Sequence, residues 1–544
     1  MARAWDRAVA SGALPAEPRD GSGAIDIARP ANPEHGDFST NLALRLAKPL
    51  GMPPGAIAAA LAGALNAEAA AQPSTLVREA STAGPGFVNL RLAQPPFERV
   101  VRRILAEPVG WGRVPGESGR HVNIEFVSAN PTGPLTVGNA RGAFVGDLLA
   151  RVLEAGGQRV TREYYFNDSG AQVRNLGASV IAVLEHAPVP EDGYHGDYVA
   201  DLANEVPSGL LGGATNDDPA SAVGSWAAQQ IRAGIEASLE RLGVHFDVWT
   251  TEGRLHSEGW VERAIERLRG AGHVYEADGA TWFRSTAFGD DKDRVIVRSD
   301  GSPTYFAADI GYVAEKFSRG FDHLIFIWGA DHHGTVARVR NAAEAMGFDK
   351  TAVQMNLTGW VRFIRDGEEI SMSKRAGTFI TLDELLSELG TDAARWFFAS
   401  RGANVNMDID IELAKRQSSE NPVYYVQYAH ARIASILRKA TDTGLAPAGG
   451  VEGLLDGEPE ARLVRVVARF PEVVEDAATA QETQAITTYA TELATAFHAF
   501  YRDARVVDPD EPERSAKRLA LVEAARVTLA NALGLLGIGA PDSM

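Results

Sequence analysis

Apolar residues recur with two different periods along this chain, and the change of period marks out its elements. Residues 122–127 alternate apolar and polar side chains as a strand does, whereas residues 140–155 carry apolar side chains at helical spacing. Gly156 ends that helical pattern, and residues 159–166 are again rich in strand-forming side chains. The order strand, helix, strand predicts a βαβ unit, which builds a parallel, doubly wound sheet.

The same periodicities predict further elements on either side of this unit. We expect strands over residues 24–29, 87–92, 295–305 and 324–328, and helices over residues 54–71, 222–242, 308–317 and 336–346. Beyond residue 421, long helical patterns over residues 423–440, 460–477, 486–503 and 514–536 predict a helical bundle. Residues 188–219 are rich in Gly, Pro, Asn and Asp, which indicates an inserted, partly irregular segment.

These elements predict three domains. Residues 1–108 form a small α+β domain, and residues 109–400 form an α/β domain of Rossmann type with an insertion around 185–225. Residues 401–544 form an all-α domain.

Composition narrows the class of protein. The chain has 544 residues, no Cys and a net charge of −18, with a sequence pI near 5.2. The lack of Cys excludes disulfides, thiolate zinc sites and cysteine nucleophiles, and the acidity argues against indiscriminate binding of nucleic acid, although basic faces can still serve a selective RNA partner. The apolar runs are too short to span a bilayer, so we expect a cytoplasmic protein.

Two segments suggest a clamp for a triphosphate. The turn from Gly133 to Asn139 offers backbone N–H groups at the start of a helix, and the loop from Ser371 to Gly377 offers Lys374. Taken alone, the first is also compatible with an ordinary strand–helix turn and the second with an exposed loop. We reject a metal site at residues 331–333, Asp-His-His, because adjacent side chains seldom converge on one ion; no metal site is predicted.

Longer motifs carry a family resemblance. Residues 130–142, NPTGPLTVGNARG, resemble the HIGH region of a class I aminoacyl-tRNA synthetase, and residues 372–377, MSKRAG, resemble its KMSKS loop. Further segments make the chain resemble a bacterial arginyl-tRNA synthetase along almost its whole length: residues 32–37, 163–170, 328–334, 421–432 and 535–544.

The resemblance implies an enzyme that activates L-arginine with ATP, accompanied by Mg²⁺, to arginyl-adenylate and transfers the arginyl group to the 3′ end of tRNA-Arg. It further implies that the amino-terminal domain touches the tRNA, that the helical domain binds the anticodon, and that the protein is a monomer. No protein nucleophile is required, because the arginine carboxylate itself attacks the α-phosphate.

The resemblance also assigns site residues. Catalysis would depend on Lys374, Thr136 and Asn139; ATP would be bound by Gly133, Thr136, Gly138, Asn139, Gly329, Asp331, Met372, Ser373 and Lys374. Arginine would be bound by Asn130, Glu252, Tyr305 and Asp309, because a guanidinium needs carboxylates and planar acceptors. Without the family, Tyr305 and Asp309 are compatible with a core aromatic residue and a helix-capping acid.

The chain departs from the family pattern in the HIGH region. Thr136 and Asn139 stand where the family carries His, and Ser371 replaces the first Lys of KMSKS. Both replacements in the turn still offer hydrogen-bond donors, but neither supplies the positive charge of an imidazolium. A non-catalytic or weakened paralogue that binds RNA or regulates is therefore the alternative function, and a nucleotidyl-transferring ligase acting on another small acid is disfavoured by the helical bundle.

Overall fold

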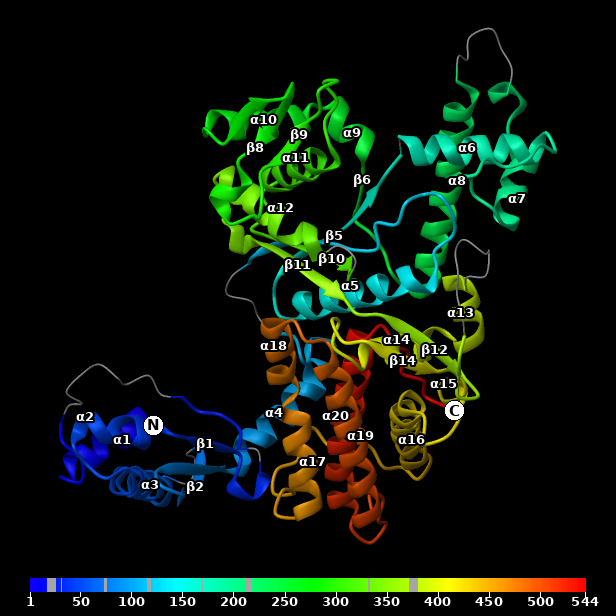
Figure 1. The fold of residues 1–544 in the computed structure, drawn as a ribbon. Helices are drawn as coiled ribbons and strands as arrows, with labels where there is room; N and C mark the ends of the chain where they lie inside the picture. Colours follow the sequence, from blue (N-terminus) through cyan, green and yellow to red (C-terminus); the bar gives the residue numbers. More distant parts are fainter. Residues whose placement is uncertain are drawn as a thin grey trace. The chain divides into compact units, whose positions relative to one another are not determined.

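The structure is a computed structural model that describes residues 1–16, 26–30, 32–72, 76–114, 119–168, 170–211, 218–330, 333–370 and 380–544 (Figure 1). It contains two compact units. Unit 1 comprises residues 1–109, 436–468 and 496–527, and unit 2 comprises residues 110–435, 469–495 and 528–544. The division passes along the helices α16 (Pro422–Asp442), α19 (Gln484–Asp503) and α20 (Pro512–Leu535).

A five-stranded parallel sheet organises unit 2. Its strands are β4 (His121–Glu125), β5 (Arg159–Phe166), β6 (Val248–Thr251), β10 (His323–Gly329) and β11 (Val353–Thr358), in the order β11-β10-β4-β5-β6. The chain adds strands on one side of β4 and then returns to add β10 and β11 on the other side. This reversal leaves a crevice at the carboxyl ends of β4 and β10, where open α/β sheets bind ligands.

Helices connect the strands of this sheet, as the βαβ pattern predicted. They are α5 (Val137–Ala155), α6 (Ala171–Leu184), α7 (Asp197–Glu205), α8 (Pro219–Leu242), α9 (Glu252–Ser257), α10 (Trp260–Gly270), α11 (Tyr305–Ser318) and α12 (His333–Ala345). A small antiparallel sheet of β7 (Val274–Ala277), β8 (Ala280–Phe283) and β9 (Arg294–Val297) lies between α10 and α11 in the sequence. Together α10, α11 and β10 bury an apolar cluster that includes Val261, Phe283, Val313 and Phe326.

The remaining elements of unit 2 follow the sheet in the sequence. They are β12 (Val361–Arg365), β13 (Glu368–Glu369), α13 (Leu382–Leu389), α14 (Thr391–Ala399), β14 (Met407–Asp410), α15 (Ile411–Lys415) and α18 (Phe470–Ala480), with parts of α16, α19 and α20. Arg395 on α14 is fully buried and donates to the carbonyls of Leu536 and Leu242 at 2.6 and 2.9 Å, and it pairs with Asp147 on α5. This side chain ties helices distant in sequence to one another.

Unit 1 has its own core. Its three-stranded antiparallel sheet, in the order β1-β3-β2, consists of β1 (Phe38–Thr40), β2 (Val77–Ala83) and β3 (Phe87–Leu92). Its helices are α1 (Ala2–Ala10), α2 (Leu42–Leu50), α3 (Pro54–Ala71), α4 (Gln94–Ala106) and α17 (Glu458–Ala468), with parts of α16, α19 and α20. Apolar residues of α1, α2, α3 and the sheet form one buried cluster. No helix in the described part of the chain is long and apolar enough to cross a membrane.

Besides the strand predicted over 122–127, which ends at Glu125, three predicted elements were wrong in detail. Residues 26–29 contribute only an isolated bridge, Ala28 to Ser39, and residues 17–25 lie outside the described part. The strand predicted over 295–305 ends at Val297, because the chain turns and α11 begins at Tyr305. The helix predicted over 460–477 is two helices, α17 and α18, since Pro471 at the start of α18 cannot continue the hydrogen bonding of a preceding helix. The domain boundaries stay a prediction.

Candidate active site

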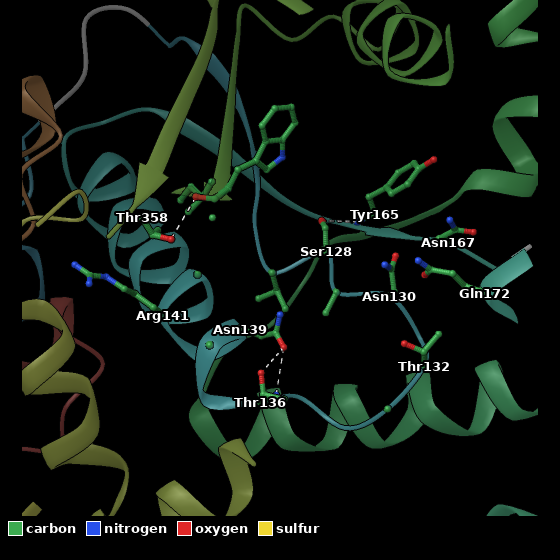
Figure 2. A pocket seen from close by; sticks show the side chains of 18 of the residues that line it. Ser128, Asn130, Thr132, Thr136, Asn139, Arg141, Tyr165, Asn167, Gln172 and Thr358 are labelled. Carbon is green, nitrogen blue, oxygen red and sulfur yellow. Dashed lines mark hydrogen bonds between the residues drawn. The ribbon is translucent and has the colours of Figure 1, made fainter. Parts of the chain in front are cut away.

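A cavity of about 1790 Å³ lies at the carboxyl ends of all five strands of the parallel sheet. Figure 2 shows part of its wall, with side chains from the β4–α5 turn facing those that follow β5. The cavity is lined by the nine predicted site residues that fall in the described part: Asn130, Gly133, Thr136, Gly138, Asn139, Glu252, Tyr305, Asp309 and Gly329. The other four, Asp331, Met372, Ser373 and Lys374, lie outside the described residues.

The chain leaves β4 through a strained turn. Val127 and Ser128 have φ of +67° and +38°, which L residues rarely adopt and which a β-branched residue adopts at a cost. The turn is held from three directions: Ser128 Oγ donates to Glu125 Oε1 at 3.1 Å and accepts from Tyr165 N at 3.1 Å, and Tyr164 OH donates to Ala129 O at 2.9 Å. This turn explains why β4 ends at Glu125, before the predicted Val127.

Thr136 and Asn139 bind each other at the start of α5. Asn139 Oδ1 accepts from the Thr136 hydroxyl at 2.9 Å and from the Thr136 backbone N at 3.3 Å (Figure 2). The Thr136 hydroxyl is therefore engaged within the turn, whereas Asn139 Nδ2 points away from Thr136. Of the two donors expected at these positions, the Asn139 amide is the one left to serve a ligand.

The chain that follows the predicted Lys374 loop is hydrogen-bonded to the same turn. Val137 N donates to Ile380 O at 3.1 Å, and Leu382 N donates to Leu135 O at 2.8 Å. Helix α13 begins directly afterwards with a capping box between Thr381 and Glu384. Residues 371–379 themselves lie outside the described part, but the residues that follow them meet the turn at 135–137 by backbone pairing.

Arg141 fixes a further stretch of the cavity wall. Its buried guanidinium donates to Gly359 O and Trp360 O, both at 3.0 Å, to Gly402 O at 3.1 Å, and to Val405 O. Burial lowers the pKa of Arg141. Because its donors face backbone carbonyls, Arg141 holds the cavity-lining segment around Gly359 against α5.

Three carboxylates of the cavity wall lie near one another. Glu252 begins α9 after β6, Asp309 lies in the second turn of α11, and Glu125 ends β4; all three line the cavity. Burial raises the pKa of Asp309 to about 7, with further increases from the charges of Glu125 and Glu252. Burial likewise raises the pKa of Glu252. Acids that resist ionisation in this way favour a cationic ligand, which would stabilise their charged forms.

Tyr305 is not a core aromatic residue in this structure, and Asp309 is not a helix cap. Tyr305 is 70% exposed and lines the cavity, so it is no core aromatic residue. The cap of α11 is Thr304, whose side chain accepts from Ala307 N, and Asp309 lies further along the helix. Both side chains line the cavity, where the family resemblance had placed them.

No pattern along residues 185–225 indicated that the insertion forms part of the cavity wall. Residues 191–195 and Tyr198 line the cavity; Tyr198 OH donates to Thr132 O at 2.8 Å, and its ring lies where a Cβ on Gly133 would be 3.3 Å away. Irregular composition carries no periodicity from which such contacts could be inferred. Glu125 was also missed, although a carboxylate in the apolar alternation of β4 was a usable signal.

Tyr424, Tyr428 and His430, which belong to the motif at residues 421–432, lie on α16. His430 is 1% exposed and its Nδ1 lies 2.8 Å from Pro541 O, which gives it a structural role. Tyr428 is 40% exposed, stacks with Tyr424 at a centroid distance of 6.3 Å, and has the Arg432 guanidinium 5.9 Å from its ring centre. Of this group, Tyr428 with Arg432 offers the exposed face.

Comparisons with protein families cover most of the chain. Residues 7–92 match the family described as "Arginyl tRNA synthetase N terminal domain", residues 218–432 match "tRNA synthetases class I (R), catalytic domain", and residues 426–544 match "DALR anticodon binding domain".

Solved structures are similar over still longer stretches. A structure from Campylobacter jejuni assigned as an arginyl-tRNA synthetase is 33% identical, with a TM-score of 0.76, and the match covers 83% of this chain and 100% of that one. Arginyl-tRNA synthetases from Thermus thermophilus (23% identity, TM-score 0.75, 100% of both chains) and Plasmodium falciparum (17%, 0.72, 99% of this chain and 98% of that one) share the fold.

Proposed function

Since this chain belongs to the arginyl-tRNA synthetase family and is a class I arginine–tRNA ligase, we propose that its cavity holds ATP at the β4–α5 turn and L-arginine at the cluster of carboxylates. The observation that carries this assignment is a single cavity whose wall has two chemically different parts. One part of the wall is the N-terminus of α5, whose helix dipole suits phosphates. The other has Asp309 and Glu252, which suit a guanidinium and an ammonium group.

In the part proposed for ATP, Gly133, Gly138 and Gly329 let backbone approach the nucleotide, and Asn139 Nδ2 donates to a phosphate oxygen. Thr136 supports this arrangement by fixing the Asn139 side chain. Asp331, Met372, Ser373 and Lys374 remain assignments from the family resemblance. Lys374 would meet the charge that develops on the phosphates from the side opposite the turn.

In the part proposed for arginine, Asn130, Glu252, Tyr305 and Asp309 surround the amino acid. Its carboxylate attacks the α-phosphate of ATP, pyrophosphate leaves, and the enzyme contributes positioning and stabilisation of charge. The terminal ribose of the tRNA then takes the arginyl group, and AMP leaves. The cavity wall supplies no nucleophile in this scheme.

Mg²⁺ would enter bound to ATP and neutralise charge on its phosphates, since it usually keeps substrate phosphates and water among its ligands. Among the described residues, no group of three or more His, Asp or Glu side chains is arranged to hold a metal by itself. No step of the reaction is assigned to this ion.

We further propose tRNA-Arg as the RNA partner, with residues 1–108 touching the tRNA and residues 401–544 recognising the anticodon. The families matched by residues 7–92 and 426–544 support these roles. The protein would act as a monomer in the cytoplasm.

The test is an aminoacylation assay of the purified full-length chain with arginine, ATP, Mg²⁺ and tRNA-Arg. Formation of arginyl-tRNA that depends on all of these substrates is the expected result. A Lys374→Ala variant should lower the rate with little change in arginine affinity, whereas Asp309→Ala should chiefly weaken arginine binding. Tight tRNA binding without any aminoacylation would overturn the proposal in favour of a non-catalytic paralogue.

A further inference from the structure

A fully buried lysine lies directly behind the part of the cavity wall proposed for arginine. Lys316 on α11 is 0% exposed, and its Nζ lies 3.1 Å from Glu125 Oε2 and 3.2 Å from Glu163 Oε2. It also donates to Asn123 Oδ1 at 2.6 Å. Lys316 therefore joins a carboxylate that lines the cavity to one that is wholly inside the core.

The network continues away from the cavity. Glu163 accepts from Arg319 at 2.7 Å, from Thr250 at 2.6 Å and from Tyr312 at 2.8 Å. Glu315 pairs with Arg319 at 2.9 Å and with Arg254 at 3.0 Å. The cations Lys316, Arg319 and Arg254 thus balance the carboxylates of Glu125, Glu163 and Glu315, so the network is neutral when Glu125 is ionised.

Two other acids that line the cavity, Glu252 and Asp309, lack such a partner among the described residues. Within the described part of the chain, neither Lys nor Arg forms an ion pair with Glu252 or Asp309; the nearest basic group to Glu252 is His256, at 4.0 Å. Arginine brings two cationic groups, its guanidinium and its α-ammonium, and these two acids can take one each. Glu125 already has its counter-charge in Lys316.

We propose that Lys316 is a positioning residue for arginine recognition, which keeps Glu125 ionised and oriented as a hydrogen-bond acceptor while Glu252 and Asp309 meet the positive charges of the substrate. This inference rests on the proposed function. An ionised carboxylate only accepts hydrogen bonds, whereas a protonated one turns a donor towards a guanidinium that has donors alone. Ionisation of Glu125 therefore decides whether its oxygens fit the substrate.

The surroundings of Glu125 show why it needs help to ionise. Burial raises the pKa of Glu125, and the charge of Glu163 on β5 raises it further, whereas Lys316 lowers it. The remaining charged or titratable groups near it are Tyr312 and Asp309 on α11, Tyr165 on β5, and Glu252 on α9. Lys316 is the cation among these groups, and Arg319 touches Glu163 but forms no ion pair with Glu125 in the described structure.

The test measures arginine affinity by calorimetry from pH 6 to pH 9.5 on the full-length protein. Arginine affinity should rise with pH and then reach a plateau. In Lys316→Gln, the pH at which this plateau begins should move upward by about 1 to 3 pH units, because one opposite charge at this distance usually changes the pKa of a carboxyl group by that amount. Arg319→Gln is the matched control, because it removes a cation from the same buried network without touching Glu125, and it should leave the plateau where it is. Lys316→Met serves if the Gln variant does not fold.

A double-mutant comparison isolates the route through Glu125. In a Glu125→Gln background, adding Lys316→Gln should produce no further pH shift. A wild-type pH profile in the Lys316 variants, an equal shift in Arg319→Gln, or a shift that persists in the Glu125→Gln background would each overturn the inference. If the unaltered protein binds no arginine at any pH, the proposed arginine site itself is wrong, which is a distinct outcome.

Discussion

The Thr136 hydroxyl and the Asn139 side-chain oxygen are hydrogen-bonded at 2.9 Å, so the two residues that replace the family's histidines hold one another. The pair fixes the first turn of α5 and directs the Asn139 amide group away from Thr136 (Figure 2). A neutral donor with a fixed orientation therefore stands where an imidazole would otherwise approach the phosphates.

Replacing Asn139 by Asp separates the two roles of this side chain. The carboxylate keeps the acceptor for Thr136 and adds an anion in the first turn of a helix. The free energy of unfolding should therefore stay the same or rise by about 0.3–1 kcal/mol. The donor to the phosphates is lost, and the rate of adenylate formation should fall about 10²- to 10³-fold. Asn139→Ala is the control, which should lose both stability and rate. Near-normal activity of the Asp variant would show that Asn139 does not face the phosphates.

Asp309→Asn should weaken arginine binding and yet stabilise the free protein. Because burial, Glu125 and Glu252 raise the pKa of Asp309 to about 7, its ionised form disfavours folding at alkaline pH, and the Asn variant should gain about 1–3 kcal/mol in unfolding free energy at pH 8. Chemical denaturation measures this gain.

Asp290→Asn provides a control of opposite sign. Asp290 is paired with Arg294 at 2.8 Å, and the hydrogen bond from this arginine lowers its pKa. Its replacement should destabilise the fold and leave arginine binding unchanged. Equal destabilisation by both variants would contradict the proposal that the ionised form of Asp309 disfavours folding.

Arginine affinity should depend on pH through Asp309. In the free protein its pKa is raised to about 7, and a bound guanidinium favours the ionised form, so the complex holds fewer protons than the separate partners. Affinity should therefore fall as pH drops below about 7 and level off above it. Calorimetry at pH 7 in two buffers of different ionisation enthalpy should detect protons released on binding, and a heat independent of the buffer would speak against this mechanism.

Tyr198 should affect ATP more than arginine. Tyr198→Phe removes only the hydroxyl that donates to Thr132 O, and we expect a several-fold rise in the KM for ATP, whereas Tyr198→Ala also removes the ring against Gly133 and should cost more. Tyr275→Phe, whose hydroxyl donates to Asp293 at 3.1 Å outside the cavity wall, is the control. An unchanged KM for ATP in both Tyr198 variants would exclude this contribution of the insertion.

The sequence predicted the parallel sheet well because its strands leave recognisable patterns: residues 324–328 are apolar throughout, and residues 159–166 are rich in β-branched and aromatic side chains. It failed where tertiary geometry overrides periodicity. The end of β4 depends on the left-handed backbone at Val127, which no pattern of side chains signals. Likewise, residues 295–305 look β-rich, but Thr304 caps a helix inside that range.

The family resemblance named nine residues that line the cavity, but it could not predict partners distant in sequence. Asp309 and Glu252 were expected near the substrate, while the link from Glu125 through Lys316 to Glu163 emerges only when β4, α11 and β5 are in place. The same holds for Arg141, a motif residue whose guanidinium binds backbone carbonyls around Gly359 and Gly402.

Residues 537–541, which follow α20, contact side chains of α14 and α16 within unit 2. Gly537 has a φ of +67° and lies so close to the Arg395 guanidinium that any side chain there would collide with it. Further on, Gln427 donates to Gly539 O at 2.9 Å, and His430 Nδ1 meets Pro541 O at 2.8 Å. A deletion that begins at Gly537 would remove the contacts that this segment makes with α14 and α16 and should lower the stability of both helices.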